Sequence, residues 1–151
     1  MASKPAGTTT TGLLRFGGGY TNNLAFTTAS DVLNLASGGI LRSNNSGVNT
    51  DIGAFNLRGV LTAGGTEVSG VRDLVVYTGL VSGTVANQIV TVHSVIADNG
   101  LGNSVRLIKG GQGSLTLTAA NTYTGGTLVH QGTLNLSSTA QLSGTNYVIP
   151  G

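Results

Sequence analysis

The sequence predicts an all-β fold, a β-solenoid that forms a single domain of 151 residues. Short apolar runs bounded by Gly, Asn, Ser or Asp recur along the chain, which is typical of strands separated by turns. Several of these runs alternate apolar and polar residues, as half-buried strands do. No segment carries an apolar period of about 3.6 residues long enough to predict a helix.

The strand-like runs begin at Leu13. Residues 1–12, "MASKPAGTTTTG", show no alternation and are predicted to form an N-terminal arm or linker, so the predicted solenoid covers residues 13–151. In chain order the runs are "LLRF" at 13, "NLAF" at 23, "DVLNLAS" at 31, "GILRS" at 39, "FNLRGVLTA" at 55, "DLVVYTG" at 73, "QIVTVHSVIAD" at 88, "VRLIKG" at 105, "GSLTLTA" at 113, "GTLNLSS" at 132 and "NYVIPG" at 146.

The alternation inside these runs predicts which side chains form the interior. In "GTLNLSS", for example, Leu134 and Leu136 point one way, whereas Thr133 and Asn135 point the other. The predicted structural core comprises Leu33, Leu35, Val90, Val92, Leu115, Leu117, Leu134 and Leu136.

The spacing of similar runs favours a solenoid. "LTLT" and "LNLS" are 19 residues apart, "FNLR" and "DLVV" 18, and "IVTV" and "VRLI" 16. Such returns suit a chain in which each turn fills the same interior slot above the turn before. A β-sandwich of antiparallel strands is the alternative, but its strands return at roughly 8–12 residues.

Composition narrows the function classes. Charged residues make up only 8% of the chain, against roughly 25% in an average domain, and the net charge is +2. The basic residues form no stripe, so we expect no nucleic-acid partner. No apolar stretch approaches the roughly 20 residues of a membrane helix, so we expect no membrane insertion by this chain. The absence of cysteine excludes disulfides and thiolate metal sites.

Few residues offer chemistry. Both histidines, His93 and His130, are predicted to be outward on strands and solvated. Three acids beside turns, Asp31, Asp73 and Asp98, are predicted to cap corners, whereas alignment of a carboxylate pair from distant turns stays open. The remaining acids are Asp51 and Glu67. "GGQG" at 110–113 lacks the Lys-Ser/Thr of a phosphate loop. We therefore predict no catalytic, cofactor-binding or metal-binding residues, and no cofactor.

One segment resembles a known family. "KGGQGSLTLTAANTYTGGTLVHQGTLNL", residues 109–136, resembles the autotransporter-associated β-strand repeat, whose typical wording is K-x-G-x-G-x-L-x-L-x-x-x-N-x-Y-x-G-x-T-x-V-x-x-G-x-L. "HSVIADNG" at 93–100 is similar to the wording that precedes such repeats. The matching residues are Lys109, Gly111, Gly113, Leu115, Leu117, Asn121, Tyr123, Gly125, Thr127, Val129, Gly132 and Leu134.

The resemblance implies a parallel β-helix in a secreted or surface-displayed bacterial passenger, which acts as a stalk, adhesin or matrix component. An exported protein would be present here in a mature or engineered form, because residues 1–12 lack the apolar run of a signal peptide. The resemblance and the spacing together predict a right-handed helix of roughly six turns that begins near residue 13. We expect a non-enzymatic protein that stacks end to end with copies of itself into an oligomer or fibre, with surface glycans or a host or matrix surface as further partners.

Two rival functions remain at this stage. A β-helical carbohydrate-binding or carbohydrate-cleaving protein needs clustered charges and aromatic side chains, and this chain has no Trp, three Phe and four Tyr. An ice-binding solenoid needs ranks of outward Thr, but aligned T-x-T does not recur in every turn.

Overall fold

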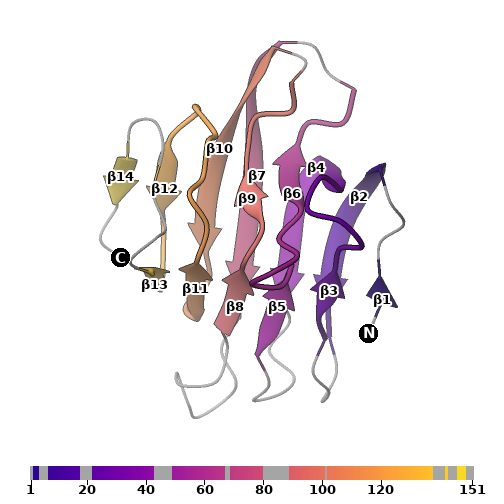
Figure 1. Ribbon diagram of the computed structural model, residues 1–151. Helices are drawn as coiled ribbons and strands as arrows, with labels where there is room; N and C mark the ends of the chain where they lie inside the picture. Colours follow the sequence, from indigo (N-terminus) through magenta and orange to yellow (C-terminus); the bar gives the residue numbers. More distant parts are fainter. Residues whose placement is uncertain are drawn as a thin grey trace.

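The computed structural model is all-β and built from parallel sheets (Figure 1). It describes residues 2–3, 7–17, 22–42, 49–66, 69–79, 89–100, 102–137, 142 and 146–148. Sheet A has the strand order β1-β3-β5-β8-β11-β13. Its strands are β1 (Ala2–Ser3), β3 (Leu24–Ala25), β5 (Thr50–Ile52), β8 (Ile89–Val92), β11 (Ser114–Leu117) and β13 (Thr133–Leu136).

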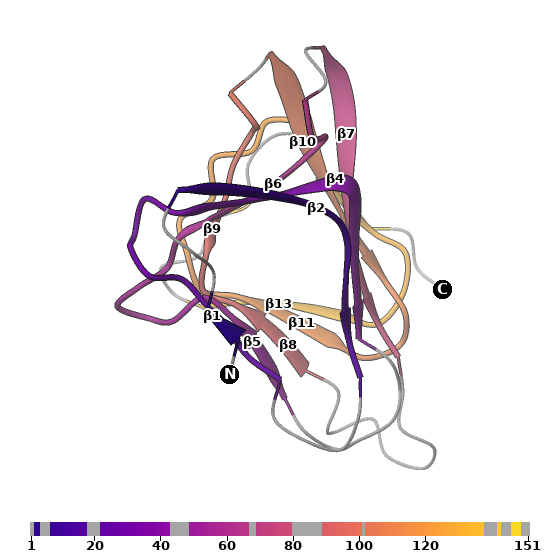
Figure 2. The ribbon, with the colours of Figure 1, turned by 90° about the vertical axis from the view of Figure 1, so that its right-hand side faces the viewer.

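Sheet B has the order β14-β12-β10-β7-β4-β6-β9, and β2 pairs with β4. Its strands are β2 (Thr8–Phe16), β4 (Val32–Arg42), β6 (Val60–Ala63), β7 (Gly70–Thr78), β9 (Val95–Ile96), β10 (Asn103–Gly110), β12 (Thr127–Val129) and β14 (Asn146–Val148). The long strand β4 pairs with β6 through its first half and with β7 through its second half. Sheet B therefore curls around two sides of a common interior, and sheet A covers the third (Figure 2).

The chain passes alternately through the two sheets. Each strand of sheet A is followed along the chain by one or two strands of sheet B, and the chain then returns to sheet A beside its previous strand. All registered strand pairs are parallel, as such crossovers require. Side chains at equivalent positions consequently stack in rows. One row across sheet A consists of Leu24, Ile52, Val92, Leu117 and Leu136.

Most of the core residues expected from the alternation are buried. They are Leu33, Leu35, Val90, Val92, Leu115 and Leu117. Leu134 is only partly buried and packs against this core. Parallel strands covered on one face bury every second residue, which is the pattern of β11 and β8.

The prediction for Leu136 is wrong. Its side chain is 46% exposed, although it stands in the same row as the fully buried Leu117. The reason is position along the stack. In the described part of sheet A, β13 pairs only with β11, so one side of Leu136 has no neighbouring strand.

Two predicted boundaries also differ from the structure. β2 begins at Thr8 and pairs with β4 from there, so residues 8–12 belong to a sheet rather than to an arm. The run that begins at Phe55 starts as a turn, because the backbones of Ala54 and Leu57 bond to each other, and strand β6 begins only at Val60. Within the described ranges, no helix has the length and apolar character needed to cross a membrane.

Candidate functional site

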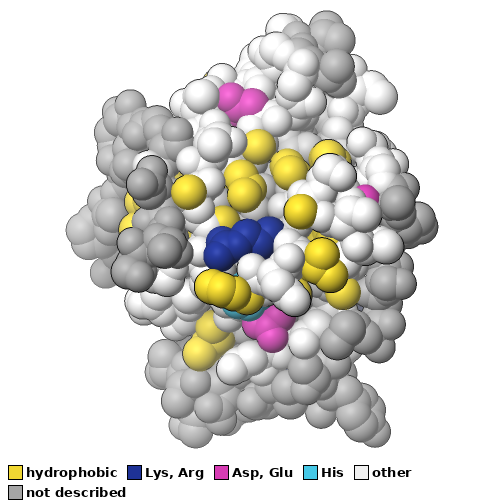
Figure 3. Space-filling model, in the orientation of Figure 1, with side chains coloured by type: hydrophobic (Ala, Val, Ile, Leu, Met, Phe, Trp, Pro, Cys, Tyr) yellow, Lys and Arg dark blue, Asp and Glu magenta, His cyan; other side chains and the backbone are white. Residues whose placement is uncertain are grey.

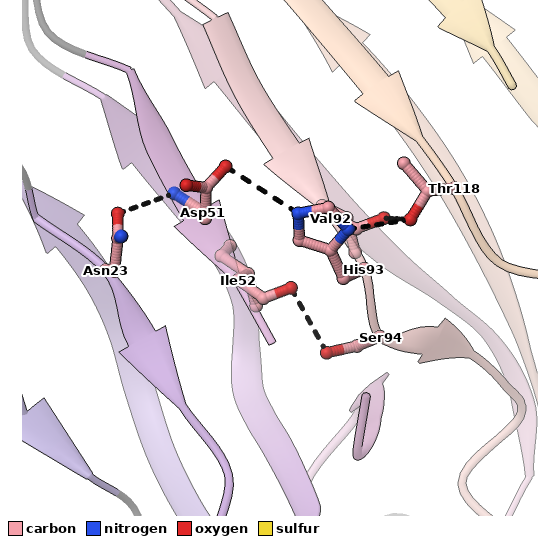
Figure 4. Close-up of polar contacts among 7 residues, drawn as sticks. All are labelled: Asn23, Asp51, Ile52, Val92, His93, Ser94 and Thr118. Carbon is pink, nitrogen blue, oxygen red and sulfur yellow. Dashed lines mark hydrogen bonds and ion pairs between the residues drawn. The ribbon is translucent and has the colours of Figure 1, made fainter. Parts of the chain in front are cut away.

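Four polar side chains form a row on the outer side of sheet A (Figure 4). The backbone N–H of Asp51 donates to Asn23 Oδ1 at 3.1 Å. Asp51 Oδ1 lies 3.8 Å from His93 Nε2. On the other side of the ring, His93 Nδ1 shares a hydrogen bond of 2.9 Å with Thr118 Oγ1. The row therefore links residues from four successive passes of the chain.

Strand alternation explains why this row faces outward. His93 and Thr118 directly follow the interior residues Val92 and Leu117, which are register partners in β8 and β11. Alternation therefore turns both polar side chains away from the core. Gly53 follows Ile52 in the preceding pass and holds the equivalent position without a side chain. A hollow beside the row is lined by Gly53 together with Asp51 and His93.

The hollow is a cleft of about 220 Å³. Its lining combines polar groups with apolar surface, and Figure 3 shows basic, acidic, histidine and hydrophobic side chains gathered together on this face. The lining residues are Asn23, Leu24, Ala25, Asp51, Gly53, Ala54, Phe55 and His93. The side chains of His93 and Asp51 are 21% and 36% exposed, so both remain accessible to a ligand.

An aromatic ring stands at the rim of the cleft. Phe55 lies in the turn between Ala54 and Leu57 and is 72% exposed. The guanidinium of Arg58 lies 4.9 Å from the centre of its ring. Arg58 also donates to the carbonyl oxygens of Phe55, at 3.3 Å, and of Thr118, at 2.8 Å. These contacts hold the turn against sheet A.

The geometry of the row suits binding better than covalent chemistry. An acid, a histidine and a hydroxyl in line have the composition of a hydrolytic triad. However, Thr118 is not among the residues that line the cleft, and its hydroxyl also donates to the carbonyl of Val92 at 3.4 Å. What the cleft presents is the carboxylate of Asp51, the ring of His93 and the ring of Phe55.

Two of the other acids act as the predicted corner ties. The carboxylate of Asp31 accepts hydrogen bonds from the backbone N–H groups of Gly7, Thr27 and Thr28 and from the hydroxyl of Thr28. These bonds, the one from the Thr28 backbone foremost, lower the pKa of Asp31 to about 2, although burial opposes them. Asp31 thereby connects the strand start at β4 to the preceding pass.

Asp98 has the same kind of role. Its Oδ1 accepts from the backbone N–H groups of Val105 and Thr124, at 2.6 and 3.0 Å, and its Oδ2 accepts from the Thr124 hydroxyl at 2.7 Å. Asp73 differs from the prediction. It lies inside β7, not at a corner, and pairs with its register partner Arg106 on β10 at 2.7 and 3.0 Å.

The remaining candidates add no second site among the described residues. His130 is exposed and follows β12, as predicted. Glu67 lies outside the described residues. The sequence pattern indicates no role for Asp51, Phe55 or Arg58. Only the alignment of Ile52 with Val92 could have brought Asp51 to His93, and the sequence does not show that register.

A buried lysine ties two corners together at the end of β10. Lys109 is fully buried, and its ammonium donates to the carbonyl oxygens of Gly110, Gly111 and Gln131 at 2.7, 2.6 and 3.0 Å. Burial lowers its pKa to about 8. Gly132 has a φ of +78°, and a Cβ there would stand 2.8 Å from the lysine Nζ. The same Cβ would stand closer still to the carbonyl oxygens of Gly113 and Gly111, so the backbone of this corner requires a glycine.

Further along the same segment, polar side chains bond to the backbone or to each other in the interior. Asn121 accepts from the backbone N–H of Ile96 at 2.9 Å and donates to the carbonyl of Ala119 at 3.1 Å. The hydroxyls of Tyr123 and Thr127 share a hydrogen bond, and both side chains are buried. The bond to Ile96 holds this pass of the chain on the pass before it, and the other two contacts are local.

The segment that contains these contacts has a family match. The family described as passenger-associated-transport-repeat matches residues 107–136. Residues 107–136 are similar to a passenger-associated transport repeat and are called the transport repeat below. Comparisons with curated proteins and with solved structures found no match. Lys109, Asn121 and Tyr123 of the transport repeat have structural contacts, whereas the cleft at Asp51 and His93 lies outside it.

Proposed function

We propose that the chain is a right-handed parallel β-helix of six turns that serves as an exported structural scaffold, in the manner of a surface stalk, adhesin or extracellular fibre. The six strands of sheet A and the parallel register of every pair support one turn per strand of sheet A. Right-handed crossovers are the rule for parallel strands in one sheet. An experimental structure with left-handed crossovers would contradict the proposed hand.

One observation carries the scaffold function. In the transport repeat, polar and charged groups are used to fasten successive passes to each other, as Lys109 does with the corners at Gly111 and Gln131. Asp31 and Asp98 do the same in other passes. Polar side chains whose hydrogen bonds are made to backbone groups stabilise the fold. This supports a protein whose function depends on its shape and rigidity.

The repeat at 107–136 supports export, since the family is named for its association with transported passengers. Antibody labelling and protease treatment of intact producing cells test this proposal. We expect the protein at the cell surface or in the medium and cleaved by added protease. Recovery in the cytosol, protected from protease until lysis, would contradict export.

We also propose that the scaffold has no enzymatic activity. Support comes from the row at His93, where Thr118 is not among the residues that line the cleft and its hydroxyl donates to the carbonyl of Val92. The test incubates the wild-type chain and the His93→Ala variant with a panel of polysaccharides and esters and measures released reducing ends and acids. Turnover by the wild type that the variant lacks would overturn this proposal.

A further inference from the structure

We propose that the cleft formed by Asn23, Asp51, Phe55 and His93 binds one neutral hexopyranose ring, as a free sugar or as the end of a saccharide chain. This binding role is additional to the scaffold function and does not depend on it. The cleft lies outside the transport repeat, so the repeat's structural contacts do not account for its residues.

The first argument is the exposed aromatic ring. Phe55 is one of only three phenylalanines and is 72% exposed, whereas Phe16 and Phe26 are buried in the core. Leaving such a ring in water forgoes the gain from burying it. The contacts of Arg58 fix the ring in place, so a flat apolar surface is already oriented at the cleft before a ligand arrives. The C–H face of a pyranose ring fits such a surface.

The second argument is the set of polar groups opposite that surface. Sugar hydroxyls both donate and accept hydrogen bonds, so a sugar site needs strong acceptors together with groups that can act either way. The accessible carboxylate of Asp51 supplies the acceptor, and charged acceptors make the stronger bonds. His93 and Asn23 line the same cleft and supply groups of the second kind.

The third argument is size and charge. At about 220 Å³ the cleft is smaller than the roughly 300–1,000 Å³ of pockets for drug-sized ligands, so it accommodates one ring rather than several. The carboxylate of Asp51 repels acidic sugars. The cation nearest to Phe55, Arg58, is already bonded to the carbonyl oxygens of Phe55 and Thr118. A neutral hexose therefore fits better than a uronic acid.

Saturation-transfer NMR with the full chain tests the proposal, using methyl glycosides of glucose, galactose, mannose and N-acetylglucosamine, with glucuronate as the acidic arm. We expect at least one neutral hexoside to bind with a dissociation constant of about 1 mM, typical of a small, single-ring contact. Phe55→Ala should weaken that binding about tenfold or more, and Asp51→Asn about fivefold. Both changes are at accessible side chains, and unchanged thermal unfolding verifies that the variants fold.

Tyr77→Ala is the matched control, because Tyr77 is another exposed aromatic residue, on β7 of sheet B, and its loss should leave binding unchanged. Oligosaccharides that end in the same sugar distinguish the source: equal affinity indicates recognition of the terminal ring alone, and higher affinity indicates a polysaccharide partner. Saturation transfer from none of the neutral hexosides at about 10 mM would overturn the proposal. So would binding that persists in the Phe55→Ala, Asp51→Asn double variant, or tighter binding of glucuronate than of every neutral sugar.

Discussion

Lys109 shows how a single residue can replace a hydrophobic core position. Its register partners in the neighbouring strands are Val76 and Val129, both buried, so the lysine occupies an interior row. Burial lowers its pKa to about 8, and at neutral pH the ammonium therefore remains protonated. Its three hydrogens are all used by carbonyl oxygens, which is what makes a buried cation tolerable.

We expect Lys109→Met to destabilise the fold by about 1–3 kcal/mol, although methionine has a similar length and no charge to desolvate. The reason is that the carbonyl oxygen of Gly111 stays buried, and those of Gly110 and Gln131 partly buried, without their donor. Urea unfolding measures the effect, with Arg15→Met on the exposed side of β2 as the control for removing one basic residue. If Lys109→Met were as stable as the wild type or more stable, burying the lysine would destabilise the fold by at least as much as its hydrogen bonds stabilise it.

The lowered pKa of Asp31 predicts that the folded protein loses stability in acid. Its pKa is about 2 in the folded chain against an ordinary value of 3.8, so the folded state favours the carboxylate. The contribution to stability is therefore complete above about pH 4 and disappears as the pH falls towards about 2. Urea unfolding between about pH 5 and pH 2 should show this loss, and Asp31→Asn should be less stable at pH 5 and have a flatter profile. Profiles of equal slope for the two proteins would contradict the assignment.

At the residue scale, the sequence predicts which way a side chain points better than it predicts which residue that side chain contacts. Alternation alone placed His93 and His130 outward, and turn chemistry alone placed Asp31 at a corner. The contact of Asp51 with His93 spans 42 residues, and it depends on how much chain each loop absorbs between β5 and β8. No local rule fixes that length, so the cleft could not be predicted.

At the scale of the strand, position along the stack decides how much a side chain contributes. Leu117 and Leu136 are register partners, and each stands between polar residues in the sequence. Among the described strands, however, Leu117 has a neighbour on both sides and Leu136 on one. Leu117→Ala should therefore cost about 2–5 kcal/mol, as buried truncations do. Leu136→Ala should cost less than about 1 kcal/mol in the monomer. Unfolding at low protein concentration measures both, and equal losses would show that Leu136 is covered in solution.

The period-two pattern predicted the interior of β8 and β11, in which every second residue is buried. In β4 it predicted Leu33 and Leu35, although Asn34 between them is also buried and bonds to the backbone of Gly65. The pattern failed at Phe55, where an apolar run is a turn. The mutual backbone bonds of Ala54 and Leu57 close that turn, and Gly59 allows the chain to pass against the ring of Phe26. The apolar residues of this turn are of the same types as those in strands, so residue type alone wrongly predicted a strand at Phe55.

At the scale of the whole molecule, only the 19-residue recurrence joins register partners. The run at Ile89 lies in sheet A and the run at Val105 in sheet B, and the run at Phe55 begins as a turn, so the 16- and 18-residue spacings do not mark equivalent strands. Each pass must fill the same interior slot, so the runs that start at Leu115 and Leu134 repeat one another and become register partners. The match to a transport repeat covers residues 107–136, which run from the end of β10 through β11 and β12 to β13. The N-terminal boundary was misjudged because the threonines of β2 carry no apolar alternation, and their strand is specified by pairing with β4.

The two ends of the stack predict how whole molecules meet. In the described part of the chain, sheet A ends with β1 on one side and β13 on the other, and each pairs with a single strand. Leu136 at one end and Leu13, on the adjoining strand β2 at the other, are 46% and 55% exposed. Edges of this kind accept a further strand, and contacts between unlike ends continue without closing. We therefore expect copies of this chain to stack end to end.

A charge at one end should prevent this stacking. Sedimentation velocity and negative-stain microscopy should show elongated species that grow with concentration, and Leu136→Lys should return the chain to monomers, because a lysine at the edge opposes strand addition. Tyr77→Lys is the control, since Tyr77 is equally exposed but lies on the side of the stack, on β7. It should associate as the wild type does. A wild-type chain that is strictly monomeric at about 1 mM, where even a contact of about 4 kcal/mol is half populated, would exclude axial assembly.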